Sequence, residues 1–370
     1  MKIAIVSASI GHGHNAVALA LQDFLTKEGP DNEVEVFDIL DDNMGYQFLK
    51  KVYIEMIKST PHVYSKLFHW SHKYDKCSSV VSYLDFLCLR ILKKIKGSYK
   101  PDIFIFTHPF PAKGYIDALK IPAWTVITDY GYHPFWYNPK MTGYFVGNAE
   151  IKKQICKKGY PKKQVMVTGI PIKKDFYREH LVQDLREENG IKKIPLILIM
   201  GGGLGLGCLK EVMESLEELK IPFKAVVLTG KNRELFRFMN YSIKDKTPER
   251  WQVLPFTDDI PSFMKKASLL ISKAGAVTLT EAGTAGLPTI IYKPIPGHEE
   301  VNARFVCDKG WAIWAKGTEE LKEITANLLG AGTDLEKMKM KCYAFNKSMG
   351  GKKIAKRIVR NVSHSVRRSF

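Results

Sequence analysis

The chain has 370 residues, of which 45% are hydrophobic and 11% aromatic, so it is long enough for two domains with sizeable cores. It carries 56 Lys and Arg against 38 Asp and Glu, and the formal net charge of +18 predicts an anionic partner: nucleic acid, a membrane surface or a phosphorylated substrate. Six scattered cysteines without a C-x-x-C pair argue against a zinc site or a disulfide framework, and no apolar run approaches the ~18 residues of a membrane span.

The amino terminus reads MKIAIVSAS and runs straight into an apolar strand pattern. It lacks the small-residue cleavage pattern of a signal peptide. Together with the cysteine usage, this predicts a cytoplasmic protein with reduced thiols. Any contact with the membrane is therefore expected to be peripheral, on the inner face of the cell membrane.

Short apolar runs in the first half predict buried parallel strands. They occupy 2–8, 33–39, 102–108, 123–129 and 143–148, and helix-period apolar residues fill 16–27 and 79–97 between them. Alternation of strand and helix is typical of a doubly wound parallel sheet. The segment 164–176 then closes this unit with Gly-Ile-Pro turn chemistry.

A second series of strand patterns follows at 195–203, 223–230, 251–256, 268–275 and 288–294, and the tail from about residue 335 is predicted to form terminal helices. The chain is thus predicted to be an α/β protein with two Rossmann-like domains, hinged near 170–190. Ligands of such sheets bind outside the carboxyl ends of the strands. Glycine-rich turns at 9–13 and 201–207 follow the first strand of each half, so both are expected at a cleft between the domains.

The second half concentrates polar groups at the ends of two neighbouring predicted strands, within 272–306. Thr278 and nearby N–H groups are suited to holding a phosphate at a helix start. Glu281, about one turn further on, is placed to bind a ribose hydroxyl pair, and Glu299 and Asn302 to bind sugar hydroxyls. Each of these residues, taken singly, also has a purely structural explanation: a helix cap, a surface charge or a loop contact. Their combination at one edge of the sheet favours a nucleotide-sugar site.

Several linked motifs resemble a known family. SIGHGHNAVALAL, TDYGYHPFW, VTGIPI, MGGGLGLG and SKAGAVTLTEAGTAGLPTIIYKPIPGHEEVNA occur in the order seen in the processive diacylglycerol glucosyltransferases and monogalactosyldiacylglycerol synthases. These are GT-B glycosyltransferases, related more distantly to the peptidoglycan N-acetylglucosaminyltransferase. The resemblance extends over nearly the whole chain.

The resemblance implies a GT-B fold and transfer of a hexose, with inversion and without a metal, from a UDP-sugar to diacylglycerol or a glycosyldiacylglycerol. It implies an acceptor and membrane-facing domain at 1–170, a UDP-sugar domain at 171–340, and a carboxyl-terminal helix and basic tail at 341–370 that return to the first domain. One departure is that His298 stands where the family commonly has Gln. His298 would lie against the donor sugar, so glucose and galactose both stay open. The implied donor-binding residues are Gly201, Gly202, Gly203, Phe256, Gly275, Thr278, Glu281, His298, Glu299 and Asn302.

His14 matches the histidine of the family's G-x-G-H turn and is the predicted general base. An acceptor hydroxyl must lose its proton as it attacks, and a neutral imidazole can take it. Asp129 has two open roles, since it either orients His14 or is itself the base. The resemblance assigns Gly13, His133 and Trp136 to the acceptor side, whereas His12 reads more readily as a surface residue of the loop.

Residues 44–100 mix basic and aromatic side chains in a way that suits an anionic bilayer surface. Lys50 and Lys51 are expected to attract the anionic surface electrostatically. Phe68 and Trp70 are expected to insert their side chains into the bilayer interface. An ordinary amphipathic helical pair with a solvated lysine face is the alternative. The tail 352–368 adds seven basic residues and no acid.

Three other classes of protein agree less well with the sequence. A UDP-N-acetylglucosamine 2-epimerase shares the fold, but would need no membrane-facing stretch. A nucleic-acid-binding protein is suggested by charge alone, without a zinc-finger or ribonucleoprotein motif, so no nucleic-acid partner is expected. A dinucleotide-dependent oxidoreductase would need the full G-x-G-x-x-G pattern, which SIGHGH lacks.

Overall fold

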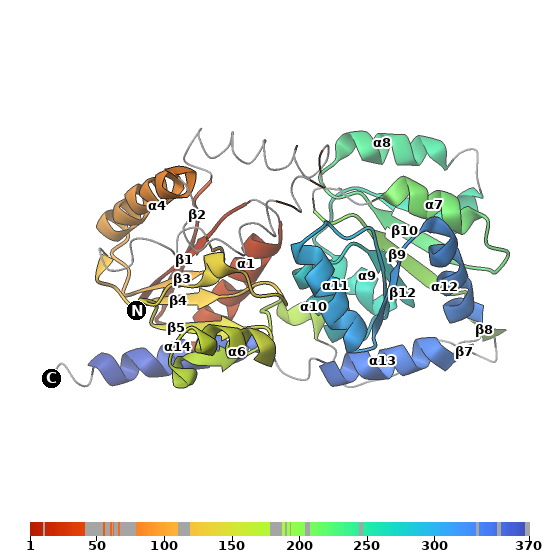
Figure 1. Ribbon diagram of the computed structural model, residues 1–370. Coiled ribbons are helices and arrows are strands. Elements are labelled where there is room, and N and C mark those ends of the chain that lie inside the picture. The colour runs from red at the N-terminus through yellow and green to blue at the C-terminus, as the bar shows by residue number, and fades with distance from the viewer. Residues whose placement is uncertain are drawn as a thin grey trace. The chain divides into compact units, whose positions relative to one another are not determined.

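The computed structural model describes the chain as two compact units (Figure 1). The first comprises 1–174, 296–298 and 348–370, and the second comprises 175–295 and 299–347. The described residues are 1–9, 12–40, 55, 60, 62, 66, 79–109, 119–177, 187–188, 191–192, 194–203, 208–243, 247–330, 333–345 and 349–366.

A six-stranded parallel sheet forms the centre of the first unit, in the order β2-β1-β3-β4-β5-β6. β1, β3, β4 and β5 are almost wholly buried, as expected for parallel strands covered on both faces. The chain leaves β1 toward one edge and returns on the other side of it, so the topological switch point lies between β1 and β3. The strands are β1 (Lys2–Ser7), β2 (Glu33–Asp38), β3 (Ile103–Phe106), β4 (Ala123–Val126), β5 (Gly143–Val146) and β6 (Val165–Val167).

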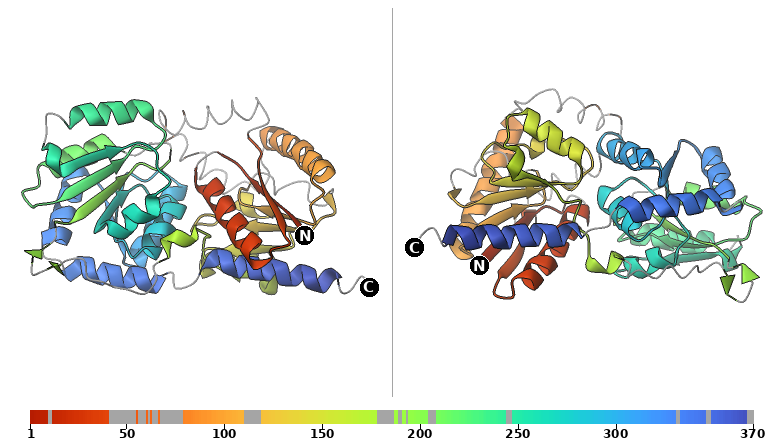
Figure 2. Two further views of the ribbon diagram at one scale, coloured as in Figure 1. Left: turned by 180° about the vertical axis from the view of Figure 1, so that it is seen from behind. Right: turned by 90° about the horizontal axis from the view of Figure 1, so that it is seen from below.

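Helices cover both faces of this sheet (Figure 2). α4 (Ser79–Ser98) and α6 (Ala149–Lys157) share a buried cluster with Phe104 and Tyr144, whereas α1 (His12–Glu28) and α14 (Gly350–Val366) pack together on the other face. Short 3-10 helices lie at Pro134–Trp136, Lys162–Gln164 and Lys174–Phe176.

The carboxyl-terminal helix α14 is an integral part of the first unit. Ile354, Ala355 and Ile358 are completely buried. α14 begins in very close contact with its neighbours: an atom at the Cβ position of Gly351 would lie 2.2 Å from the ring of Phe24 in α1. The predicted return of this helix to the amino-terminal domain is thereby confirmed.

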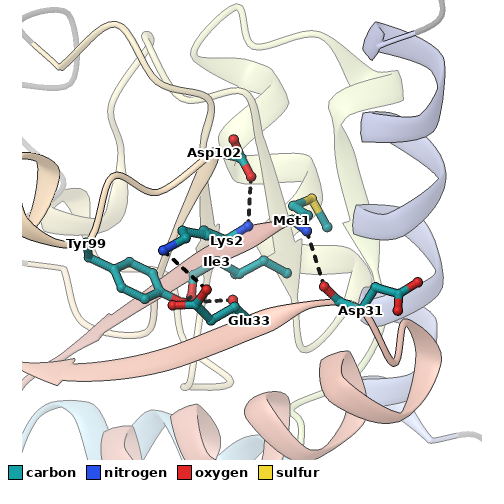
Figure 3. A network of polar contacts seen from close by, with 7 residues as sticks. All are labelled: Met1, Lys2, Ile3, Asp31, Glu33, Tyr99 and Asp102. Carbon is teal, nitrogen blue, oxygen red and sulfur yellow. Dashed lines mark hydrogen bonds and ion pairs between the residues drawn. The ribbon is translucent and has the colours of Figure 1, made fainter.

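Polar contacts hold the strand starts of the first sheet together (Figure 3). The Lys2 amide donates to the Asp102 carboxylate at 2.7 Å, and its ammonium pairs with Glu33 at 3.2 Å. The Tyr99 hydroxyl donates to the Glu33 carbonyl at 2.8 Å. These contacts connect the starts of β1, β2 and β3.

The second unit repeats the same architecture, with the strand order β11-β10-β9-β12-β13-β14 and the switch point between β9 and β12. The strands are β9 (Leu196–Met200), β10 (Lys224–Leu228), β11 (Trp251–Leu254), β12 (Leu269–Ser272), β13 (Thr289–Tyr292) and β14 (Ala312–Ala315). The helices are α7 (Leu209–Glu217), α8 (Arg233–Ser242), α9 (Ile260–Lys266), α10 (Ala276–Thr284), α11 (His298–Asp308), α12 (Thr318–Gly330) and α13 (Thr333–Phe345). A 3-10 turn at Pro248–Arg250 and a small antiparallel pair, β7 (Glu187–Glu188) and β8 (Ile191–Lys192), complete the unit.

The predicted α/β class with two Rossmann-like domains is confirmed. The edge strands β6 and β14 are additional to the predicted ones, and both are only partly buried. The predicted strands end earlier than expected, because the last residues of each predicted run already belong to loops at the carboxyl edge.

Most of the predicted membrane-facing stretch falls outside the described residues, including Lys50, Lys51, Phe68 and Trp70. Lys93 and Lys94 are described, and both are exposed on α4. Within the described part of the chain, no helix has the length and apolar character needed to cross a bilayer.

Candidate active site

In the first unit, polar side chains meet around His14, at the switch point between β1 and β3. His14 lies in the first turn of α1, directly after the loop that follows β1. Its Nδ1 lies 2.8 Å from the carbonyl oxygen of Thr107, which follows β3, and 2.9 Å from Oγ1 of Thr128, which follows β4. Three adjacent strands thus place their ends around one imidazole.

The Thr107 carbonyl favours one tautomer of His14. A carbonyl oxygen only accepts hydrogen bonds, so its contact favours the ring with the proton on Nδ1, which then donates to Thr107. Nε2 then holds the lone pair of the neutral ring. Among the described residues, the hydrogen bonds of His14 are made at Nδ1.

The surroundings keep His14 neutral near pH 7. Burial lowers its pKa below the ordinary value of 6.5, and the negative charge of Asp129 and the Thr107 carbonyl oppose this less strongly. The ring of His108 lies edge-on, with the centroids 4.6 Å apart. Burial also lowers the pKa of His108 well below 6.5, and His14 acts in the same direction.

A second set of hydrogen bonds fixes the turn before α1. Asn15 accepts from the Ser7 hydroxyl at 2.5 Å and donates to the Asp38 carboxylate at 2.8 Å. The other oxygen of Asp38 accepts from the amide of Ser9 at 3.1 Å. Because Asp38 ends β2, it ties the loop after β1 to the neighbouring strand and holds the start of α1 in place.

The other residues predicted for the acceptor side lie along the same edge of the sheet. Gly13 precedes His14 in α1, and Asp129 is partly buried in the loop after β4. Trp136 is buried, with its ring 6.3 Å from that of His14. His133 caps the 3-10 helix by accepting from the Phe135 amide at 3.2 Å.

In the second unit, the glycine-rich turn and α10 lie at the switch point between β9 and β12 (Figure 1). Gly201, Gly202 and Gly203 follow β9, and Gly202 has a positive φ of 75°. Gly275 occupies the N-cap of α10 without a side-chain cap, so the first amides of the helix point toward this edge. Such free N–H groups, aided by the helix dipole, favour an anion.

Two buried polar residues of α11 hold the start of α10. Glu299 pairs with Lys273, and its second carboxylate oxygen accepts from the Ile295 amide at 2.8 Å. Asn302 donates to the Ala274 carbonyl at 3.2 Å. Both side chains therefore bind protein groups in this structure, and their predicted contacts with sugar hydroxyls stay predictions.

The remaining predicted donor residues do not all lie in one unit. Thr278 and Glu281 are partly buried in the first two turns of α10, whereas His298, which begins α11, is grouped with the first unit. Phe256 is 42% exposed, and the Lys231 ammonium lies 5.2 Å from its ring centre. The Lys231 amide in turn donates to the Gly203 carbonyl at 3.1 Å, which links Phe256 to the glycine-rich turn.

Sequence reasoning did not single out Thr107, His108, Thr128 or Lys273. A signal was present, because all four are polar residues within two positions of the end of a buried apolar run. In a parallel sheet, such residues come from distant parts of the chain and meet at one edge.

Comparison with known proteins identifies both halves. Residues 14–172 match the family model described as monogalactosyldiacylglycerol (MGDG) synthase, and residues 196–360 match the glycosyltransferase family 28 C-terminal domain. The chain is 29% identical over 348 residues to the processive diacylglycerol beta-glucosyltransferase of Bacillus cereus (strain ATCC 10987 / NRS 248), covering 91% of this chain and 88% of the relative. The same figures hold for a Bacillus anthracis (strain A0248) relative of that name.

Two solved structures share the whole architecture. MurG of Acinetobacter baumannii aligns with a TM-score of 0.64 at 21% identity, over 97% of this chain and 100% of MurG. The MnaA–UDP complex of S. aureus aligns with a TM-score of 0.64 at 13% identity, over 99% of this chain and 97% of that chain.

Fold and family models together define the protein as a glycosyltransferase of GT-B fold. Within that class, the first half of the chain matches the monogalactosyldiacylglycerol synthase model, and most of its length is similar to the processive diacylglycerol glucosyltransferases. The resemblance drawn from the sequence motifs is confirmed.

Proposed function

We propose that the protein transfers a hexose, glucose in the first instance, from a UDP-sugar to diacylglycerol or a glycosyldiacylglycerol, with inversion at the anomeric carbon. The observation that carries this proposal is His14, a neutral imidazole whose Nδ1 is engaged by the protein and whose Nε2 is the proposed proton acceptor. The names of the relatives in Bacillus support the lipid acceptor and the hexose.

In the proposed reaction, the lipid hydroxyl attacks the anomeric carbon and gives its proton to Nε2 of His14. The bond from the anomeric carbon to the β-phosphate oxygen breaks, and its electron pair leaves with UDP. Asp129 raises the affinity of His14 for the proton it receives, because its negative charge favours the imidazolium. The division into an acceptor domain at 1–170, a donor domain at 171–340 and a carboxyl-terminal segment at 341–370 is part of this proposal.

The direct test is incubation of the protein with UDP-[14C]glucose and vesicles containing diacylglycerol, followed by separation of the lipids. A labelled glycolipid is the expected product, and a parallel reaction with UDP-galactose determines the hexose. A 2-epimerase would instead convert UDP-N-acetylglucosamine without any lipid. Conversion of that substrate with no labelled lipid would contradict the proposal.

UDP is expected to bind the second unit through the 201–203 turn, Thr278 and Glu281. Glu281→Ala is predicted to weaken UDP binding by roughly 1–3 kcal/mol, because charge-assisted hydrogen bonds to the ribose are lost. Titration calorimetry measures this directly, and Glu323→Ala on α12 serves as a control carboxylate of the same unit. Unchanged UDP affinity in Glu281→Ala would remove this residue from the site.

Catalysis is proposed to proceed without a metal ion. Within the part of the chain that the structure describes, no group of three or more His, Cys, Asp or Glu is placed to hold a metal. The uncapped start of α10 offers N–H groups to the diphosphate instead. Activity is therefore expected to persist in excess EDTA. A loss of turnover that magnesium or manganese restores would contradict this.

The stretch 44–100 is proposed to bring the acceptor domain to an anionic membrane surface. Charge attraction at such a surface is screened within about 8–10 Å at physiological salt. Vesicle binding, measured by sedimentation, is expected to require anionic lipid and to fall as salt rises. Reversing Lys50, Lys51, Lys93 and Lys94 to Glu should reduce binding and leave UDP affinity intact. Equal binding to neutral vesicles would assign these lysines to a solvated face.

A further inference from the structure

Lys273, the second residue of the SKAGAV motif, lies at the switch point of the sheet in the second unit. It is the first residue after β12, and the glycine-rich turn is the first segment after β9. These two strands flank the switch point of the sheet. The equivalent place in the first unit holds His14 and Thr107.

The side chain of Lys273 lies directly over the glycine-rich turn. An atom at the Cβ position of Gly202 would be 2.9 Å from Cε of Lys273 and 3.8 Å from its Nζ. Gly202 also has a positive φ of 75°, which disfavours other residues. The turn thus leaves room for the lysine, and the ammonium group sits beside backbone that is free to approach a ligand closely.

The ammonium group of Lys273 is mostly buried and forms an ion pair with the carboxylate of Glu299. The side chain of Lys273 is 17% exposed and that of Glu299 is 2% exposed. Removing two charges from water is costly, and a nearby opposite charge compensates for it. A lysine has three N–H donors, and Glu299 accepts one, since the other Glu299 oxygen accepts from the Ile295 amide.

We propose that Lys273 is the cation that binds the diphosphate of the donor and stabilises the UDP leaving group. This inference rests on the proposed function. When the bond between the anomeric carbon and the β-phosphate oxygen breaks, negative charge grows on that oxygen. Lys273 donates a hydrogen bond to the diphosphate and keeps its own proton, while the acceptor's proton goes to His14.

Glu299 has a positioning role in this arrangement. It holds the partly buried ammonium beside the glycine-rich turn when no donor is bound. Its backbone contact at Ile295 holds the carboxylate in place, so the lysine can share its remaining N–H groups with phosphate oxygens without leaving the pair. A fixed cation in a dry site stabilises developing charge more strongly than one in water.

The test compares UDP with uridine, which lacks the phosphates, by calorimetry on the full chain. Lys273→Met alone would leave Glu299 buried without its partner, so the Lys273→Met/Glu299→Gln variant removes both charges together. We expect this double variant to bind UDP at least about tenfold more weakly than wild type and to bind uridine within about threefold. Glu299→Gln alone keeps the cation but removes the carboxylate that positions it, so its UDP affinity should fall less than that of the double variant.

Lys322→Met is the matched control, because Lys322 is also ion-paired in this unit, with Glu218 directly after α7 and with Glu319 in the first turn of α12. It should bind UDP like wild type. Wild-type UDP affinity in a folded double variant, judged by thermal melting, would overturn the proposal. So would an equal loss of uridine affinity, which would place the damage at the nucleoside. A wild-type protein that binds no UDP would instead contradict the proposed function itself.

Discussion

Replacing His14 by alanine is expected to lower kcat by about 10²–10⁴-fold, the range typical of a positioned general base. UDP affinity should stay near that of wild type, because the donor contacts are proposed for the second unit. The contacts at Nδ1 hold the ring in place, and alanine removes Nε2, the proposed proton acceptor. Initial rates with labelled UDP-glucose and diacylglycerol vesicles measure the loss.

His12→Ala is the matched control, since His12 begins the same helix, two residues before His14. It should retain most of the activity. The variant Thr128→Val tests the positioning of the ring, because it removes one of the two oxygen atoms near Nδ1. A smaller loss in kcat with unchanged KM is expected there, and Thr128→Ser should restore it. Full activity in His14→Ala would assign the base to another residue, with Asp129 first among them.

The pH dependence of the wild-type rate is expected to follow the protonation of His14. A general base works in its unprotonated form, and burial lowers the pKa of His14 below 6.5. The rate should therefore stay at its plateau down to the ordinary pKa of histidine and fall only at more acidic pH. Replacing Asp129 by Asn removes the negative charge that raises this pKa, so the acidic limb should move to still lower pH. A shift in the opposite direction would contradict the assignment.

The second large effect concerns the stability of the first unit. Gly351→Ala in α14 is expected to lower the free energy of unfolding by about 1–3 kcal/mol, although alanine is the better helix former. The added Cβ would lie 2.2 Å from the buried ring of Phe24, so either the ring or α14 must shift. Thermal and urea unfolding measure the change.

Gly97→Ala provides the matched control in the same unit. Gly97 lies in the last turn of α4, and a Cβ there meets no atom within 4 Å. That substitution should leave stability unchanged or raise it by up to about 1 kcal/mol through helix propensity. Equal behaviour of the two variants would mean that α14 does not dock against α1 as described.

The order of strands and helices could be predicted because each buried parallel strand is a short apolar run, readable without tertiary information. The glycine-rich turn after β9 and the start of α10 could be predicted too, because glycines and helix-start residues are recognisable from the local sequence. The contact between Lys273 and Glu299 could not, because it depends on where β12 and α11 bring two residues 26 positions apart. The Thr107 carbonyl near His14 is a backbone group, and no residue type in the sequence marks it.

The place of α14 has a consequence for biosynthesis. Ribosomes deliver the chain from the amino terminus, and domains generally fold as units in that order. Here the unit made first lacks the helix that covers α1 until the last residues have been translated. The second unit is complete by then, so the nascent chain carries an uncovered apolar face on its older half throughout synthesis. Translation that stops before residue 350 would leave that face exposed for good, and such products are expected to be taken up by chaperones and proteases.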